Sequence, residues 1–176
     1  MSAIDYVPRA EGHVSPFGKA VEAMHVTATA GGDALFAEMN GWYAVRVAVA
    51  PRHAEQTDDV EMAAQVTQLA RRIFVARTRE YYRLMEIHMQ PNPVMLRRAR
   101  DDFEGTVEDR QASGYAAGGA VEVTSIGMKQ FVIHLEPGTC VSLGSEGLGA
   151  ALTSAANDMV AAWLQVLADY KRQLWA

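Results

Sequence analysis

Two stretches of the chain carry a large apolar residue at every second position, and both stop at a proline. The first is residues 44–49, before Pro51, and the second is residues 130–135, before Pro137. Their apolar positions are Val45, Val47 and Val49, followed in the second stretch by Phe131, Ile133 and Leu135. This alternation predicts strands with one buried face, and proline ends a strand because it has no N–H to donate. We therefore expect one half-buried strand in each half of the chain.

Turn signals before these strands predict hairpins. Asn40-Gly41 is a strong hairpin signal because both residues tolerate positive φ, and Ile126-Gly127 occupies the same place before the second strand. The segments 26–31 and 112–117 supply a third candidate strand each. The pattern therefore predicts two small antiparallel sheets of three strands.

A long stretch with helical periodicity follows each hairpin. The first helix has a stripe formed by Met62, Val66, Leu69, Ile73, Ala76 and Leu84, and the C-terminal helix has one formed by Leu148, Leu152, Ala155, Met159, Ala162 and Val166. A second apolar stripe beside each one widens the face, so we expect both helices to pack on two sides. A charged amphipathic helix begins near Pro93, whereas its counterpart in residues 15–25 is shorter.

The two halves repeat the same order of elements. At an offset of 86 residues Gly41 falls on Gly127 and Pro51 on Pro137, and apolar positions coincide through both strand and helix. A repeat that keeps both periods in register indicates two copies of one structural unit. We predict an α+β fold in which a helix–three-stranded antiparallel sheet–helix unit occurs twice. The divisions expected are an N-terminal arm (residues 1–15), a first unit (residues 16–90) and a second unit (residues 91–176).

Composition restricts where the protein works. The chain has 16 Lys and Arg against 21 Asp and Glu, a net charge of −5, which argues against strong non-specific nucleic-acid binding but leaves room for a local basic patch. The one cysteine, Cys140, excludes an intramolecular disulfide and fits a reducing cytoplasm. The start of the chain lacks the features of a signal peptide, and no apolar run approaches the roughly 18 residues of a membrane span. We expect a cytoplasmic protein with no membrane contact.

Residues able to support catalysis or metal binding are scattered. The histidines are His13, His25, His53, His88 and His134, and their spacing matches no metal motif. Residues 144–152, GSEGLGAAL, open a helix as a phosphate loop does, but the Gly-Lys-Ser/Thr ending is missing, so Ser145 is expected to cap that helix. No base accompanies Cys140 or the nearby serines, and Cys140 is expected to fill the core. We predict that the protein is not an enzyme and takes no metal or organic cofactor.

Arginines gather in the middle of this acidic chain. The candidate phosphate-contacting residues are Arg71, Arg72, Arg79 and Arg83 on the first long helix and Arg97, Arg98 and Arg100 on the next. At 100° per residue, Arg72, Arg79 and Arg83 fall within about 40° of one another. Arginine forks match phosphate oxygens, which favours a phosphate-binding ridge. A solvated helix face paired with Glu80, Glu86 and neighbouring aspartates explains the same residues equally well.

Three segments together resemble the YbaB/EbfC family of bacterial nucleoid-associated proteins. They are GGAVEVTSIG (residues 118–127), FVIHLEP (residues 131–137) and LGAALTSAANDMVAAW (residues 148–163). Residues 27–51 resemble actinobacterial versions of the same unit. The resemblance covers roughly residues 16–89 and 93–174. None of its motifs is catalytic, and they are informative because they occur in this order.

The resemblance implies that each unit pairs with a second one through shared sheets and helices. Family members are single units that form homodimers, so a chain with two units is expected to form an intrachain pseudo-dimer, with higher homo-oligomers still open. The contact between units is expected to involve Phe74, Tyr81, Val160, Trp163 and Leu167. The shortened first helix departs from the family pattern, as does Arg71-Arg72 where the second copy has Asn157-Asp158.

Two functions from different classes remain open at this point. The family resemblance implies a nucleoid-associated protein that grips double-stranded DNA through its arginine-bearing helices with little sequence preference. The alternative is a cytosolic accessory factor or chaperone that holds a protein partner, for which type VII secretion is one setting. Tyr82 and Glu86 match the loose Y-x-x-x-D/E pattern of substrates of that system, but the W-x-G turn expected with it is absent.

Overall fold

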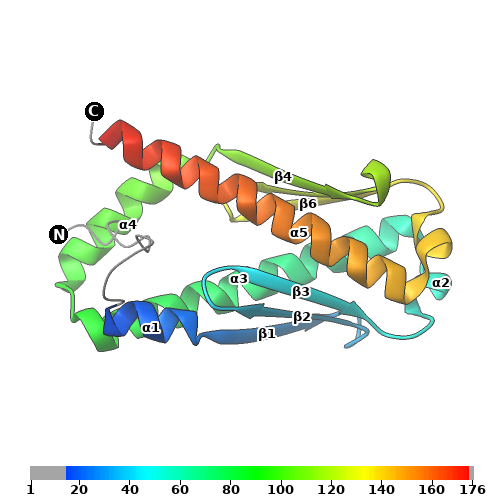
Figure 1. The fold of residues 1–176 in the computed structure, drawn as a ribbon, viewed down its shortest axis with the longest axis horizontal. Helices are drawn as coiled ribbons and strands as arrows, with labels where there is room; N and C mark the ends of the chain where they lie inside the picture. Colours follow the sequence, from blue (N-terminus) through cyan, green and yellow to red (C-terminus); the bar gives the residue numbers. More distant parts are fainter. Residues whose placement is uncertain (1–14, 175–176) are drawn as a thin grey trace.

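The computed structural model describes residues 15–174 (Figure 1). The first half contains α1 (Pro16–Glu22), β1 (His25–Ala30), β2 (Leu35–Asn40), β3 (Ala44–Val49), α2 (His53–Gln56) and α3 (Asp59–Met89). The second half contains α4 (Pro93–Val107), β4 (Gln111–Ala116), the 3-10 turn η1 (Ala117–Gly119), β5 (Val121–Ile126), β6 (Gln130–Leu135) and α5 (Thr139–Leu174). The α+β class is confirmed, as are the hairpins and the third strands near residues 26–31 and 112–117. The short helix α2 was not predicted.

The strands form two separate antiparallel sheets, in the orders β1-β2-β3 and β4-β5-β6. Each strand of the second sheet begins 86 residues after its counterpart in the first, and the pairing register agrees with this offset throughout. The hairpin turns follow the same rule, since Gly41 and Gly127 have φ of 59° and 60°. At Gly127 a Cβ would also lie 2.6 Å from the carbonyl oxygen of Glu108, so this turn requires glycine.

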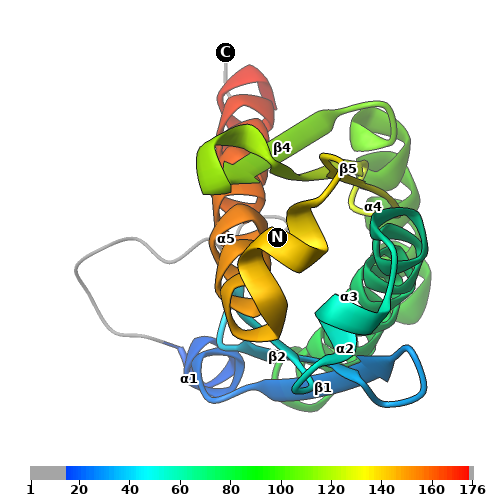
Figure 2. The ribbon, with the colours of Figure 1, turned by 90° about the vertical axis from the view of Figure 1, so that its right-hand side faces the viewer.

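Each long helix packs on both sheets. Helix α3 contacts β1 and β2 of its own half and β6 of the other half, while α5 contacts β4 and β5 and also β3. Viewed end-on, the two sheets lie above and below, and α5 and α3 form the two sides (Figure 2). The largest core cluster therefore draws side chains from both halves of the chain. This arrangement explains why both helices carry wide apolar faces.

Polar side chains of α5 bind the outer edge of β3. Asn157 accepts a hydrogen bond from the N–H of Val45 (3.1 Å) and donates one to its carbonyl oxygen (2.8 Å). One turn earlier, the Thr153 hydroxyl accepts from the N–H of Val47 at 2.9 Å. These side chains satisfy backbone groups that no neighbouring strand pairs, so the helix of the second half protects an edge strand of the first.

The start of α5 is bound by residues of the first half, and here one prediction is wrong. The backbone of α5 breaks at Gly144, where φ is 66° and ψ is 178°. Ser145 does not cap the helix that follows it. Its hydroxyl accepts from the N–H of Ala54 in α2 (3.0 Å) and donates to the Glu55 carboxylate (2.9 Å). The local sequence predicted a helix cap at Ser145, but its hydroxyl instead bonds to the backbone of Ala54, 91 positions away.

Asp59, at the start of α3, makes a second contact of this kind. Its carboxylate accepts hydrogen bonds from the N–H groups of Gly138 (2.7 Å) and Cys140 (2.8 Å) at the start of α5. The hydrogen bond from Cys140, followed by that from Gly138, holds the pKa of Asp59 below its ordinary value. Asp59 thus satisfies two of the N–H groups that a helix start leaves without partners.

Acidification is expected to weaken this contact. Because the folded pKa of Asp59 is lowered, its stabilisation is present above the unfolded pKa of about 3.9 and is lost as the pH falls through the folded pKa. Asp59 is only partly buried and water screens its charge, so we expect the loss to be no more than about 1 kcal/mol. Urea unfolding at a series of pH values between about 6 and about 2 measures it. Asp59→Asn should remove this part of the acid dependence and Asp101→Asn should keep it; equal pH profiles for all three proteins would contradict the assignment.

Candidate nucleic-acid interface

The predicted arginines lie along α3, from its middle (Arg71) to its last two turns (Arg83), and on the first turns of α4; the end of α3 and the start of α4 meet at one end of the molecule (Figure 1). Helix α3 ends at Gln90, which adopts a left-handed conformation, and Asn92 caps α4 by accepting from the N–H of Val94. Residues 71–100 contain eight arginines and two glutamates, whereas the whole chain has a net charge of −5. Residues 71–100 are therefore basic in an otherwise acidic chain, and we call this segment, which runs from the middle of α3 to the first turns of α4, the arginine end.

Three of the seven predicted arginines already have partners within the protein. Arg72 donates to the carbonyl oxygen of Thr29 at the end of β1, at 2.6 Å. Arg83 pairs with Glu80, with N···O distances of 2.8 and 2.6 Å. The Arg100 side chain lies 3.8 Å from Asp101 and 3.9 Å from Glu104, and over the Tyr82 ring at 5.8 Å. These arginines would have to share or exchange partners to contact a phosphate.

The other four are exposed and have no hydrogen bond or ion pair within the part of the chain that the structure describes. They are Arg71, Arg79, Arg97 and Arg98. On α3 the residues Arg72, Arg79 and Arg83 share one flank, but Arg71 lies on a different side of the helix because successive residues turn by about 100°. The seven therefore form no single strip, and four exposed guanidinium groups are directly available to an anion.

The residues predicted at the contact between units occupy two clusters. Phe74 stacks on Phe131 of β6 with ring centroids 4.9 Å apart and an interplanar angle of 17°, which joins the two halves. Val160 and Trp163 are buried in the same large core, and Leu167 packs against it. Tyr81 instead packs in a smaller cluster with Phe17 at 5.5 Å and Trp42 at 6.3 Å, both from its own half.

One further arginine, Arg77, was missed in the sequence. It is 8% exposed and lies between two aromatic rings, 4.2 Å from the ring centroid of Tyr43 and 4.7 Å from that of Tyr81. Arg77 follows Ile73 by four residues and precedes Leu84 by seven, so it falls on the main apolar stripe of α3. A charged residue in the middle of an apolar stripe was the signal that identifies it.

Residues 15–174 bring together few side chains that could support catalysis or hold a metal ion. No group of three His, Cys, Asp or Glu side chains in that range is placed to hold a metal ion. Burial raises the pKa of the Cys140 thiol to about 12, which keeps it protonated and unreactive at neutral pH. His53 bonds to Gln65 at 2.7 Å, whereas His25, His88 and His134 are exposed and His13 lies outside the described residues.

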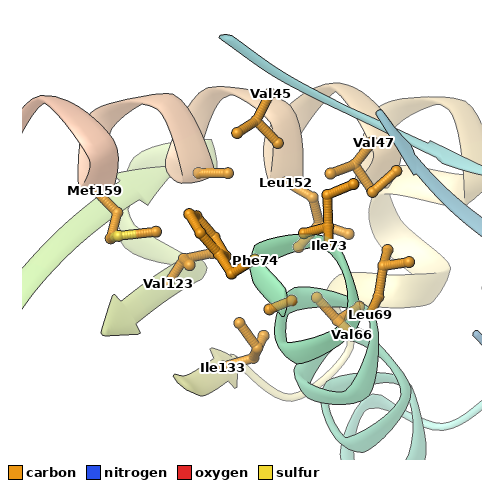
Figure 3. Close-up of a pocket in the computed structure, with 13 residues that line it drawn as sticks. Val45, Val47, Val66, Leu69, Ile73, Phe74, Val123, Ile133, Leu152 and Met159 are labelled. Atoms are coloured by element: carbon orange, nitrogen blue, oxygen red, sulfur yellow. The ribbon is translucent and has the colours of Figure 1, made fainter. Parts of the chain in front are cut away.

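A small cavity lies where the two long helices meet the sheets (Figure 3). Its volume is about 30 Å³, and it is lined by apolar side chains from both halves, among them Phe74, Leu152, Met159 and Ile133. A space of that size without polar groups holds neither a cofactor nor an ordered water. It is a packing gap of the core.

No helix among the described residues combines the length and apolar character that a membrane span requires. Comparisons of the chain with protein-family models, with curated proteins and with solved structures found no match.

Proposed function

We propose that the chain is an intrachain pseudo-dimer of two YbaB/EbfC-like units. Three observations support this: the constant offset of 86 residues between strands, the same strand order in both sheets, and the packing of each long helix on a strand of the other half. In this interpretation each unit supplies the cover that its partner's sheet lacks, as two chains do in a homodimer. The shorter α1 and the Arg71-Arg72 pair make the two units unequal.

We further propose that the protein is a non-enzymatic, nucleoid-associated protein that binds double-stranded DNA through the arginine end. The observation that carries this proposal is the group of four exposed arginines that have no partner among residues 15–174, on a segment whose charge is opposite to that of the chain. Phosphate contacts made by such side chains position a protein on a duplex without reading its sequence. The acidic remainder of the protein restricts binding to this end, because it repels the DNA backbone.

DNA affinity is expected to fall steeply with salt. With on the order of four to six phosphates neutralised, log K should drop by about 0.9 per phosphate for each tenfold rise in salt concentration. Replacing Arg71, Arg79, Arg97 and Arg98 together by Ala should weaken binding equally on unrelated duplexes and flatten that slope by about three units or more, since these contacts carry no base information. Fluorescence anisotropy across a salt series measures both quantities.

The matched control removes the same charge elsewhere. A variant with Arg46, Arg110, Lys129 and Arg172 replaced by Ala has the same net charge as the test variant, and all four side chains are exposed. It should retain most of the salt slope if the arginine end is the interface. Equal loss in both variants would show that only net charge matters, and absence of binding by the wild type at low salt and micromolar concentration would reject the DNA proposal.

The protein-partner alternative is favoured by one specific observation. The last turn of α3 and the first turn of α4 carry exposed apolar side chains: Ile87 (52% exposed), Val94 (60%) and Met95 (63%). Methionine and aliphatic side chains of this kind are typical of adaptable protein-binding surfaces. A cytosolic accessory factor, for type VII secretion or another system, would use these side chains at the junction of α3 and α4. Replacing the three by Ser should then abolish capture of a partner in a pull-down while leaving DNA affinity unchanged.

A further inference from the structure

Arg77 is a charged group that the fold encloses without neutralising. Its Nε atom is buried and has no hydrogen-bond partner, and no carboxylate of the described residues lies within ion-pair distance of its guanidinium. Burying a charge without a partner is costly, and native proteins rarely retain such a group without a use. An unmatched guanidinium that is more than nine-tenths buried therefore indicates a missing anion.

The fold itself does not require a cation at this position. At the offset of 86 residues the corresponding residue is Trp163, which is 3% exposed and packs in the main core. The flanking tyrosines are also absent there, since Lys129 corresponds to Tyr43 and Leu167 to Tyr81. The first half thus has a cation and two aromatic rings where the second half has apolar packing and a lysine.

Aromatic rings flank the guanidinium group of Arg77 and fix its orientation. The ring centroids of Tyr43 and Tyr81 lie 4.2 and 4.7 Å from the guanidinium carbon, and Nε is a fully buried guanidinium nitrogen without a hydrogen-bond partner among the described residues. The ring of Tyr82 lies 5.7 Å from that of Tyr81, and Arg100 of α4 lies over Tyr82 at 5.8 Å. Two further kinds of hydrogen-bond donor occur in this region, the Arg100 guanidinium and the tyrosine hydroxyls, on residues of α3, α4 and the β2–β3 turn.

We propose that Arg77 binds a phosphate group at this junction, with Arg100 and the neighbouring tyrosine hydroxyls as secondary donors. The planar fork of arginine matches two phosphate oxygens, and stacking on aromatic rings fixes its orientation in advance. The phosphate is either that of a small phosphate-bearing molecule or that of a nucleic-acid backbone. The inference does not rest on DNA binding, because a free phosphate group satisfies the same donors.

Inorganic phosphate is the probe for the first test, with the full chain compared in phosphate and in chloride at equal ionic strength. Phosphate at about four times its Kd should raise the Tm of the wild type by about 2–4 °C. Arg77→Met, which keeps the length of the side chain, should lose this rise, while Arg46→Met, at an exposed arginine far along the chain, should keep it. The same rise in wild type and Arg77→Met would overturn the proposal.

A measurement on the wild type alone covers the case in which Arg77→Met does not fold. The Nε–H of Arg77 is enclosed, so it should exchange slowly and give a ¹⁵N–¹H signal. That signal should shift saturably on phosphate titration, and a signal that does not move would equally overturn the proposal. A short duplex in chloride buffer then identifies the source: loss of duplex affinity in Arg77→Met beyond that in Arg97→Met assigns a backbone phosphate, and unchanged duplex affinity together with lost phosphate binding assigns a small phosphate-bearing ligand.

Discussion

Replacing Gly114 with alanine is expected to destabilise the protein by about 3 kcal/mol or more. Gly114 lies in the middle of β4, where α5 crosses it, and a Cβ at that position would lie 2.0 Å from the carbonyl oxygen of Ala155 and 2.3 Å from the backbone nitrogen of Met159. Both obstacles are backbone atoms of a long helix, so relief requires the helix to move away from the sheet. Overpacking of this severity exceeds the usual range of about 1–3 kcal/mol.

Gly105 provides the matched control for this substitution. It lies in α4, where a Cβ would meet no atom within 4 Å, and Gly105→Ala should stabilise the protein by up to about 1 kcal/mol because alanine is the better helix former. Urea unfolding of both variants measures the two changes in the free energy of unfolding. A small loss for Gly114→Ala would mean that α5 does not approach β4 as closely as the structure has it.

Asn157→Ala is expected to cost about 2–4 kcal/mol. The side-chain amide of Asn157 satisfies both the N–H and the carbonyl oxygen of Val45, and truncation leaves these two partly buried groups without a partner. Each such group carries a desolvation penalty of about 1–3 kcal/mol, which partial access of water reduces. The same substitution uncovers the edge of β3, so the variant should also aggregate more readily.

The position 86 residues earlier tests whether this effect is specific. Arg71→Ala changes the corresponding residue of α3, which is exposed and makes no hydrogen bond within the described chain, so its effect should stay within about 0.5 kcal/mol. Unfolding in guanidinium chloride and light scattering, measured for both variants, give the comparison. Equal losses at the two positions would contradict the role assigned to Asn157.

Local patterns in the sequence were sufficient for the strands and the long helices, but not for the short helix α2. The alternation around Val45 and Phe131 defines a strand period, and the glycines of the two hairpins define turns. Both signals arise within a few residues of sequence. Residues whose partners are distant in sequence could not be placed in this way. Ser145 looked like a local helix cap and bonds to α2, and Tyr81, expected with Phe74 at one interface, packs with Phe17 in a separate cluster.

For the arginines too, the sequence showed some features and only the structure showed others. Their clustering on α3 and α4 was visible in the sequence, but whether a guanidinium is free depends on which carboxylate or carbonyl lies beside it in space. Arg72 is held by a strand carbonyl 43 positions away, and Arg79 is not held at all by the described residues. Arg77 was not among the predicted residues, and only the tertiary structure shows that it is buried between two tyrosines.

What the sequence determined by itself is the class of the fold, the order of its elements and the offset of 86 residues between its halves, because each depends on periodicity and turn chemistry. The tertiary structure alone decided which helix covers which sheet. Helix α5 protects β3 and Asp59 binds the start of α5 because wide apolar faces and unpaired backbone groups require a cover, while nothing within a short window of sequence specifies which segment supplies it.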